Sequence, residues 1–376
     1  TTHILPFSFI SLLTILAVTA AIFLFFKRNI TFSEILLLFK SNWKWIVIEE
    51  IFFLLVFALW AYIRGFAPDI NGLEKFMDFG FVNSIMRSTY FPPKDMWLTP
   101  DSINYYYFGH FITAVLTKLS LLPSNYTYNL MIATIAGLTF VQSFSLAINL
   151  YSRISKRISF SRFVVVGLLT AVIITFAGNL HTLYTFFKPY QNEYPVPLWQ
   201  LTFSPESFPN SYWYPNATRF IHNTIHEFPI YSWTVSDLHG HVADIPFVLL
   251  TLTFIFSLFS RGPQKFKKAA DPQGSFFMRT YHALDRNPVR LSHLLISSLL
   301  LAVMYMTNAW DGLIYLLLIL FIIAYFEFLI TNNRKTNLIR RISQSLKRSG
   351  IPAVILIGGF LLFSLPFSIF FKPFVS

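Results

Sequence analysis

The chain has 376 residues, of which 55% are hydrophobic and only 12% are charged, and its mean hydropathy is +0.55. Soluble domains carry about 25% charged residues, so this composition argues against a soluble fold and predicts an integral membrane protein. The absence of cysteine excludes disulfides, thiolate metal sites and a cysteine nucleophile. The net charge of +12 comes mainly from short loops between apolar runs, which argues against nucleic acid as a partner.

The apolar runs predict eight membrane spans of roughly 17–23 residues, the length that a hydrocarbon core of about 30 Å requires. The first run lacks the basic flank and small-residue cleavage site of a signal peptide. We therefore expect an all-α polytopic helical bundle with residues 1–376 as a single transmembrane domain. The spans lie near residues 4–26, 46–63, 128–150, 163–180, 242–260, 291–307, 313–330 and 351–371.

A ninth apolar stretch, residues 105–122, decides the topology. If it spans, the basic loop 152–162 faces outward and every later basic loop changes side with it. If it lies in the membrane interface, the cytoplasmic loops hold 21 of the 29 Lys and Arg residues, as the positive-inside tendency favours. We therefore predict an interfacial helix at 105–122 and both termini outside. The four cytoplasmic loops are then 27–45, 152–162, 261–290 and 331–350.

The predicted outer face consists of two long loops, 65–127 and 181–241, and the short turn 308–312. Structureless loops that long are uncommon and are usually functional, and these collect most of the acidic and histidine residues. Ionisable groups gathered at a membrane face are costly unless they serve a site. We expect loop 181–241, which is rich in proline and aromatic residues, to be irregular.

The first loop carries Glu74 and Asp78, which are four residues apart and would share one face of a helix. Paired carboxylates can provide a general base, because burial and like charge raise one pKa. A solvated amphipathic helix with Lys75 beside the acids is the structural alternative. Farther along, Tyr105, Tyr106, Tyr107 and His110 predict either an aromatic belt at the membrane surface or a platform that binds a sugar or a phosphate.

The second loop holds two histidine segments. His222 and His226 have helical i, i+4 spacing and could share a metal or an anionic group. Asp237, His239 and His241 would lie on one face of an extended segment, and together they suit a divalent metal or a phosphate clamp. Satisfied polar residues at the membrane interface are the alternative interpretation of both segments.

The turn 308–312 contains Asp311 between two spans. Asp311 is either a helix cap or a group at the bottom of the site.

Five ordered strings between about Glu50 and Phe371 resemble the YYY-motif family of membrane proteins, named for its triple tyrosine. The chain has Leu73, Phe76 and Gly240 where the family pattern has Thr, Pro and Pro. The strings are Asn71-Gly-Leu-Glu74-Lys-Phe-Met-Asp78-Phe, Pro92-Pro-Lys-Asp95-Met-Trp97, Asn104-Tyr-Tyr-Tyr-Phe-Gly-His110, Ser236-Asp-Leu-His239-Gly-His241 and Asn308-Ala-Trp-Asp311.

That family is in turn similar to the GT-C glycosyltransferases, a likeness at the level of fold. The resemblance implies a polyprenyl-phosphate-linked sugar as donor, an acidic base or metal ligand in the first outer loop at Glu74 or Asp78, and an interfacial helix in that loop. It also implies a multi-pass protein of the plasma membrane whose active face is outward, and a divalent metal such as Mg or Mn as a candidate cofactor. Asp237, His239 and His241 are the candidate metal ligands.

The function expected is therefore transfer of a sugar, with inversion, from a lipid donor in the bilayer to an acceptor glycan, lipid or protein. Lys75, Arg87, Arg219 or a histidine would hold the donor phosphate, since only eight basic residues fall in the outer segments. A transporter or channel, or a non-catalytic assembly subunit, is the alternative. A single active site requires that Glu74 or Asp78 lie within roughly 10–12 Å of His239 or His241.

Overall fold

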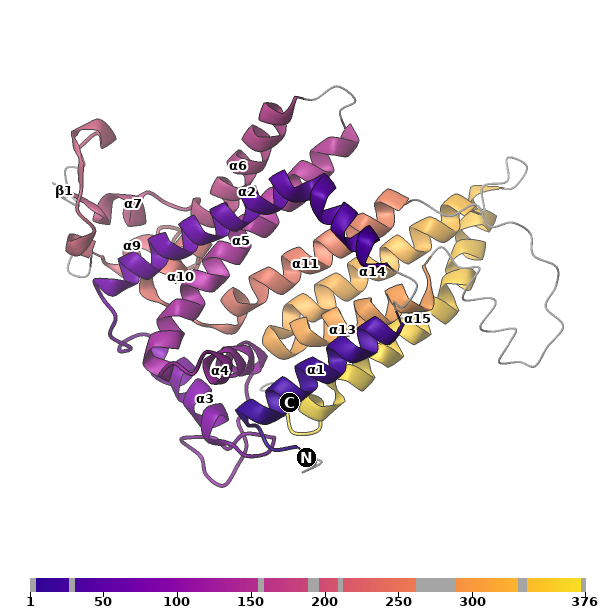
Figure 1. The fold of residues 1–376 in the computed structure, drawn as a ribbon, viewed down its shortest axis with the longest axis horizontal. Helices are drawn as coiled ribbons and strands as arrows, with labels where there is room; N and C mark the ends of the chain where they lie inside the picture. Colours follow the sequence, from indigo (N-terminus) through magenta and orange to yellow (C-terminus); the bar gives the residue numbers. More distant parts are fainter. Residues whose placement is uncertain are drawn as a thin grey trace. The chain divides into compact units, whose positions relative to one another are not determined.

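The computed structural model describes residues 5–26, 31–154, 159–188, 196–208, 212–261, 289–330 and 337–372, and helices dominate it (Figure 1). The prediction of an all-α membrane protein is confirmed. Among the described residues, five helices are long and apolar enough to cross a membrane: α2 (Phe32–Gly65), α5 (Ser124–Ile154), α11 (Gly240–Arg261), α14 (Ala309–Ile330) and α15 (Leu338–Ser368).

Three shorter apolar helices accompany them: α1 (Phe9–Phe26), α6 (Phe160–Phe176) and α13 (Leu291–Thr307). Each of the eight predicted spans falls on one of these eight helices. How many of them cross the bilayer stays a prediction.

Parts of the predicted cytoplasmic loops 27–45, 152–162 and 331–350 are helical in the structure. Helix α2 already begins at Phe32, where Thr31 and Glu34 form a reciprocal capping box that fixes the first turn. Helix α15 begins at Leu338, with the Asn337 side chain as its N-terminal cap. The predicted loop 261–290 lies almost entirely outside the described residues.

The described contacts divide the chain into two units, the first of which comprises Thr1–Ile103 and Gly109–Pro246. Its centre is a layer in which α5 packs against both α2 and α6 (Figure 1). Two glycines permit this close packing. A Cβ at Gly137 would lie 2.9 Å from the Phe53 ring of α2, and a Cβ at Gly167 of α6 would lie 2.5 Å from the Phe144 ring of α5.

Along the chain, α2 is followed by α3 (Lys75–Arg87) and α4 (Phe108–Ser120), which precede α5. Helix α4 covers most of the stretch predicted to be interfacial. Its 13 residues reach about 20 Å at 1.5 Å per residue, which is short of a hydrocarbon core of about 30 Å. The length of α4 therefore supports the predicted topology.

The described residues between α6 and α11 include short regular elements that the sequence did not indicate. It contains α7 (His181–Thr185), the two-stranded antiparallel pair β1 (Phe187–Lys188) and β2 (Thr202–Phe203), α9 (Tyr214–Thr218) and α10 (Pro229–Val235), with 3-10 turns at Leu198–Gln200 and Pro205–Ser207. Helix α10 is tied to α6 because the buried Trp233 side chain donates from Nε1 to the carbonyl of Thr175 at 3.0 Å.

The second unit comprises Asn104–Phe108 and Phe247–Ser376, so that α11 passes from the first unit into the second after Pro246. Helices α13, α14 and α15 pack against one another in pairs. Their core includes Leu301, Ile323, Phe326 and Leu356, all at most 2% exposed. Within this unit the Ser298 hydroxyl of α13 donates to the Leu356 carbonyl of α15 at 2.9 Å.

Candidate active site

The start of α3 separates the two acids of the first loop. Gly72 and Leu73 both have positive φ, +70° and +50°, so the chain turns sharply before Glu74, the N-terminal cap of the helix. The Glu74 side chain is 59% exposed, whereas Asp78, one turn later, lies on the buried face of α3 and is fully buried. The two carboxylates therefore have different environments, although they are one helical turn apart.

Asp78 is held by a buried histidine of α4. Nε2 of His110 lies 2.9 Å from Oδ1 of Asp78, and both side chains are 0% exposed. The other carboxylate oxygen, Oδ2, and the other ring nitrogen, Nδ1, are buried without a hydrogen-bond partner among the described residues. A buried carboxylate oxygen without a partner is costly, so Oδ2 is available to a ligand.

A left-handed turn at Ser236 positions the segment that carries Asp237 and His239. Ser236, at φ +60° and ψ +50°, ends α10. Its carbonyl accepts a hydrogen bond from the Tyr128 hydroxyl at 3.1 Å, and its hydroxyl donates to Oδ1 of Asn129 at 3.2 Å. Two residues at the start of α5 thus fix the backbone on which Asp237 lies.

The first loop and the segment before α11 meet directly. Oε2 of Glu74 contacts Nδ1 of His239, which meets the spacing expected of a single site. One ligand atom from each of Asp78, Asp237 and His239 lies within 4.8 Å of the others. The same holds for Glu227, Asp237 and His241, in which Nε2 of His241 is 3.5 Å from Oε2 of Glu227.

We name these residues the acid–histidine cluster. Its members share the first unit of the chain and come from α3, α4, the segment before α10 and the residues around the start of α11. They are Glu74, Asp78, His110, Glu227, Asp237, His239 and His241.

The cluster is rich in negative charge, and this raises the pKa of its central carboxyl. Burial raises the pKa of Asp237 well above its ordinary value, and the charges of Asp78, Glu227 and Glu74 raise it further, while a hydrogen bond from the His239 backbone opposes them. Burial also raises the pKa of Glu227, to which Glu74 adds, against the charges of His239 and Arg219. Four carboxylates gathered this closely repel one another unless protons or a cation compensate.

The donor set fits a divalent metal ion. Carboxylate oxygens and imidazole nitrogens are ligands that Mn²⁺, Zn²⁺ and related ions accept. The unpartnered Oδ2 of the buried Asp78 and the mutually repelling carboxylates are both features that a cation would satisfy. The predicted ligands Asp237, His239 and His241 are together in the cluster, and Asp78 and Glu227 join them.

Lys75 links the cluster to a neighbouring pocket. Burial and the charge of Arg64 lower the pKa of Lys75 to about 8, and the charges of Asp237 and Asp69 oppose this shift. Lys75 is therefore within electrostatic range of both Asp237 and Asp69. Asp69 is one of the residues that line this pocket.

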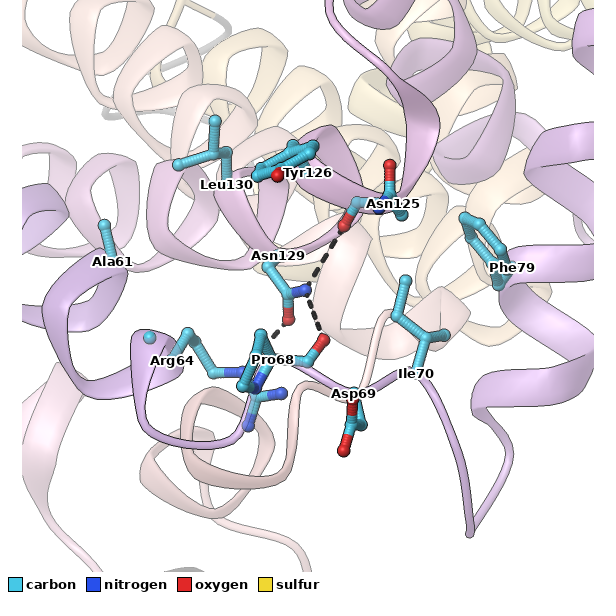
Figure 2. Close-up of a pocket in the computed structure, with 11 residues that line it drawn as sticks. Ala61, Arg64, Pro68, Asp69, Ile70, Phe79, Asn125, Tyr126, Asn129 and Leu130 are labelled. Carbon is cyan, nitrogen blue, oxygen red and sulfur yellow. Dashed lines mark hydrogen bonds between the residues drawn. The ribbon is translucent and has the colours of Figure 1, made fainter. Parts of the chain in front are cut away.

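The pocket has a volume of about 520 Å³ and lies where the ends of α2 and α5 meet the loop after α2 (Figure 2). Figure 2 shows Asn129 at its centre, accepting from Nε of Arg64 at 3.1 Å and donating to the Pro68 carbonyl at 3.0 Å. Arg64 is 2% exposed, and it also donates to the backbone of Thr234 and Ala67. Its guanidinium therefore builds the pocket wall, and most of the other lining side chains are apolar.

The histidines His222 and His226 do not take the helical arrangement that their spacing allowed. Asn223 has φ +57°, and the residues from Phe220 to Phe228 are a turn and irregular backbone rather than a helix. Nδ1 of His226 lies 3.1 Å from the Thr224 hydroxyl, while His222 is exposed. The shared i, i+4 site was therefore a wrong expectation, because a left-handed residue interrupts the segment.

The two predicted phosphate-binding arginines lie in different surroundings. Arg219 donates from Nη1 to the Thr218 hydroxyl at 2.6 Å, and its charge lowers the pKa of Glu227, which places it beside the cluster. Arg87 is exposed in the last turn of α3, nine residues after Asp78 and so about 13 Å farther along the helix axis. Arg87 is thus remote from the carboxylates.

The remaining predicted residues belong to the second unit. Tyr106 packs on Phe371 and Tyr107 on Phe367, with ring centroids 5.2 and 5.5 Å apart, and Tyr105 packs on Tyr106. Burial raises the pKa of Tyr107 to about 12. The triple tyrosine is thus part of the aromatic packing around the end of α15.

Asp311 also lies in the second unit. It is in the first turn of α14, where its Oδ2 accepts from the Asn308 side chain at 2.6 Å. This contact supports the interpretation of Asp311 as part of the helix start.

Sequence reasoning missed two groups of residues. Glu227 follows His226 in a loop rich in acidic residues and histidine, and the composition of this loop could have indicated Glu227 as a site residue. Arg64, Asn129 and Ser236, which form the scaffold behind Asp237, gave no such signal. Arg64 and Asn129 fall at the ends of apolar spans, and nothing in the sequence reveals that they contact each other.

Comparison with known proteins identifies one family. Its sequence model, described as uncharacterized membrane protein (DUF2298), matches residues 1–376. No curated protein and no solved structure matches the chain.

Proposed function

The chain belongs to the DUF2298 family of membrane proteins, and we propose that it is a glycosyltransferase that moves a sugar from a polyprenyl-phosphate-type lipid to an acceptor. One observation carries this proposal. Glu74 and Asp78 of the first long loop lie with Asp237 and His239 of the second, where they form a single carboxylate and histidine site. Such a site contains a candidate base, a candidate metal set and, at Lys75, a cation for phosphate.

Glu74 is the better candidate for the general base. Its carboxylate is 59% exposed and contacts His239, whereas Asp78 is fully buried behind it and paired with His110. An acceptor hydroxyl can therefore reach Glu74, and His239 can hold the carboxylate in position. In the reaction, the hydroxyl proton passes to Glu74 while the acceptor oxygen forms a bond to the anomeric carbon. The bond from that carbon to the donor phosphate breaks, and the lipid phosphate leaves with the electron pair.

The leaving phosphate gains negative charge, which must be stabilised. Lys75 is suited to this because its half-buried ammonium group is in range of Asp237, although the acids around it need a further cation. A divalent ion held by Asp237, His239 and neighbouring carboxylates would supply positive charge to the leaving phosphate. The pocket is lined by Arg64 and Asp69, whose charges act on Lys75. Its lining is mostly apolar, and it has room for part of the lipid donor.

This proposal places the cluster at the outward face of the plasma membrane. The observations that favour this side are the concentration of basic residues in the opposite loops and the short length of α4. A donor lipid would enter from the bilayer, and the acceptor, a glycan, lipid or protein, would approach Glu74 from the aqueous side.

The test uses the full chain, purified and reconstituted in vesicles with Mn²⁺ and a panel of radiolabelled polyprenyl-phosphate sugars. We expect time-dependent loss of at least one donor, with label released to water or transferred to an added acceptor. Asp237→Asn should abolish the loss, while Glu206→Gln should not, because Glu206 is exposed and paired with Lys188 outside the cluster. Equal donor loss in the wild type and Asp237→Asn would contradict the proposal.

A further inference from the structure

We propose that the acid–histidine cluster binds two divalent metal ions, with the carboxylate of Asp237 shared between them. This inference deepens the proposed function by giving its site a two-ion phosphate clamp. It can nevertheless be tested separately, because the number of bound ions can be measured with no donor or acceptor present.

The first ion would be held by Asp78, Asp237 and His239, whose candidate ligand atoms all lie within 4.8 Å of one another. Asp78 is fully buried, and its Oδ2 has no hydrogen-bond partner among the described residues. Glu74 contacts Nδ1 of His239. A carboxylate on the second ring nitrogen is the usual arrangement around a metal-binding histidine, because it fixes the tautomer and the ring orientation.

The second ion would be held by Glu227, Asp237 and His241, which also lie within 4.8 Å of one another. Nε2 of His241 is 3.5 Å from Oε2 of Glu227. That distance is longer than an ordinary N–H···O hydrogen bond of about 2.7–3.2 Å. It is close to the separation of two ligand atoms on one ion, about 3.0–3.4 Å when each bond is about 2.1 Å.

The arrangement of the two sets favours two ions over one. Asp237 belongs to both sets, and the other two members differ between them. A carboxylate has two oxygens and can bind one ion through each, as in two-metal sites whose ions are about 3.5–4 Å apart.

The negative charge of the cluster also favours two ions. Four carboxylates lie in the cluster, because Asp78 and Asp237 share one ligand set, Glu227 and Asp237 share the other, and Glu74 contacts His239. When they are ionised, two divalent ions neutralise them, whereas one leaves half of the negative charge uncompensated. Two ions whose charge balances that of the carboxylates can in turn bind two oxygens of one phosphate group. The proposed donor carries such a group.

The experiment counts Mn²⁺ on the purified full-length protein and records the electron paramagnetic resonance spectrum. The wild type should bind two Mn²⁺ per chain and give the broadened signal of a spin-coupled pair. Glu227→Gln should bind one Mn²⁺ and give the six-line spectrum of an isolated ion. Asp237→Asn should lose both ions, and Glu206→Gln, an acid outside the cluster, should keep both. If Glu227→Gln does not fold, His241→Gln provides the same test of the second ion.

One Mn²⁺ per wild-type chain with a six-line spectrum would overturn the inference, as would two coupled ions retained in both Glu227→Gln and His241→Gln. The result separates this inference from the proposed function. Two coupled ions without donor turnover would refute the proposed transferase and support the two-ion site. Donor turnover with one bound ion would support the transferase and refute the two-ion site.

Discussion

The carboxylate of Glu74 contacts Nδ1 of His239, so that the loop after α2 and the segment before α11 form one site. Glu74 precedes α3 by a single residue, and His239 precedes α11 in the same way. Both side chains are therefore held at helix starts, whose backbone is fixed by hydrogen bonds. This contact is the basis for assigning the two long loops to a common function.

The buried pair of Asp78 and His110 should make a large contribution to stability. His110→Leu leaves a fully buried carboxylate without its partner and should lower the free energy of unfolding by about 3–5 kcal/mol. The double variant Asp78→Leu/His110→Leu should recover much of this loss, since it removes the uncompensated charge. Thermal or urea unfolding of the four proteins in metal-free detergent solution forms a double-mutant cycle. Additive effects of the two substitutions would show that the residues do not interact.

Removal of metal should lower the thermal stability of the protein. Mn²⁺ at about 100 times its dissociation constant should stabilise the folded chain by about 2.7 kcal/mol per site, because the carboxylates of the cluster repel one another without it. We expect the unfolding temperature to rise on addition of Mn²⁺ and to fall with EDTA, and Asp237→Asn should show no response. A response of equal size in Asp237→Asn would locate the effect elsewhere.

Lys75 should titrate far below an ordinary lysine. Burial and Arg64 lower its pKa from 10.5 to about 8, so the amine loses its charge as the pH rises through about 8. An amine acylating reagent, which reacts with the neutral form, should modify Lys75 half-maximally near pH 8, as mapped by mass spectrometry in metal-free buffer. Affinity for a phosphate donor should fall over the same range, and this fall should be absent in Lys75→Arg. A labelling midpoint near pH 10.5 would contradict the lowered pKa of the half-buried Lys75.

Helix α4 should not cross the membrane. The chain contains no cysteine, so single substitutions report topology without background. An impermeant thiol reagent applied to intact cells should label Asp101→Cys, before α4, and should leave Arg162→Cys, after α5, unlabelled until the membrane is permeabilised. If α4 did cross, the two sites would be on the same side of the membrane, and labelling of both in intact cells would refute the topology.

The helical part of the fold was predictable because each long helix carries its own signal. An apolar run such as 291–307 coincides with α13, since a helix in a bilayer must be both apolar and long enough. The ends of α2 and α15 were harder to predict. Their N-terminal extensions depend on local caps at Thr31 and Asn337 that hydropathy does not detect.

Most members of the candidate site could be predicted from the sequence, but its geometry could not. Glu74, Asp78, Asp237 and His239 were all identified from their clustering in the predicted outer loops. Their different exposures depend on the turn at Gly72 and Leu73 and on the contacts of Ser236 with α5. Such contacts join residues far apart in the chain, so no local pattern reveals them. The pairing of His110 with Asp78, rather than with the tyrosines beside it, depends on packing in the same way.

The measurement that tests the central claim most directly is turnover of a polyprenyl-phosphate sugar by Glu74→Gln at saturating Mn²⁺. If Glu74 deprotonates the acceptor, turnover should fall by about 10²–10⁴-fold, while the fold, Mn²⁺ binding and donor binding are retained. Asp78→Asn should cost less if Asp78 only orients the site, and Glu206→Gln, an exposed acid paired with Lys188, should match the wild type. Full turnover in Glu74→Gln would contradict its role as the base, and full turnover in both cluster variants would remove the first loop from the chemistry.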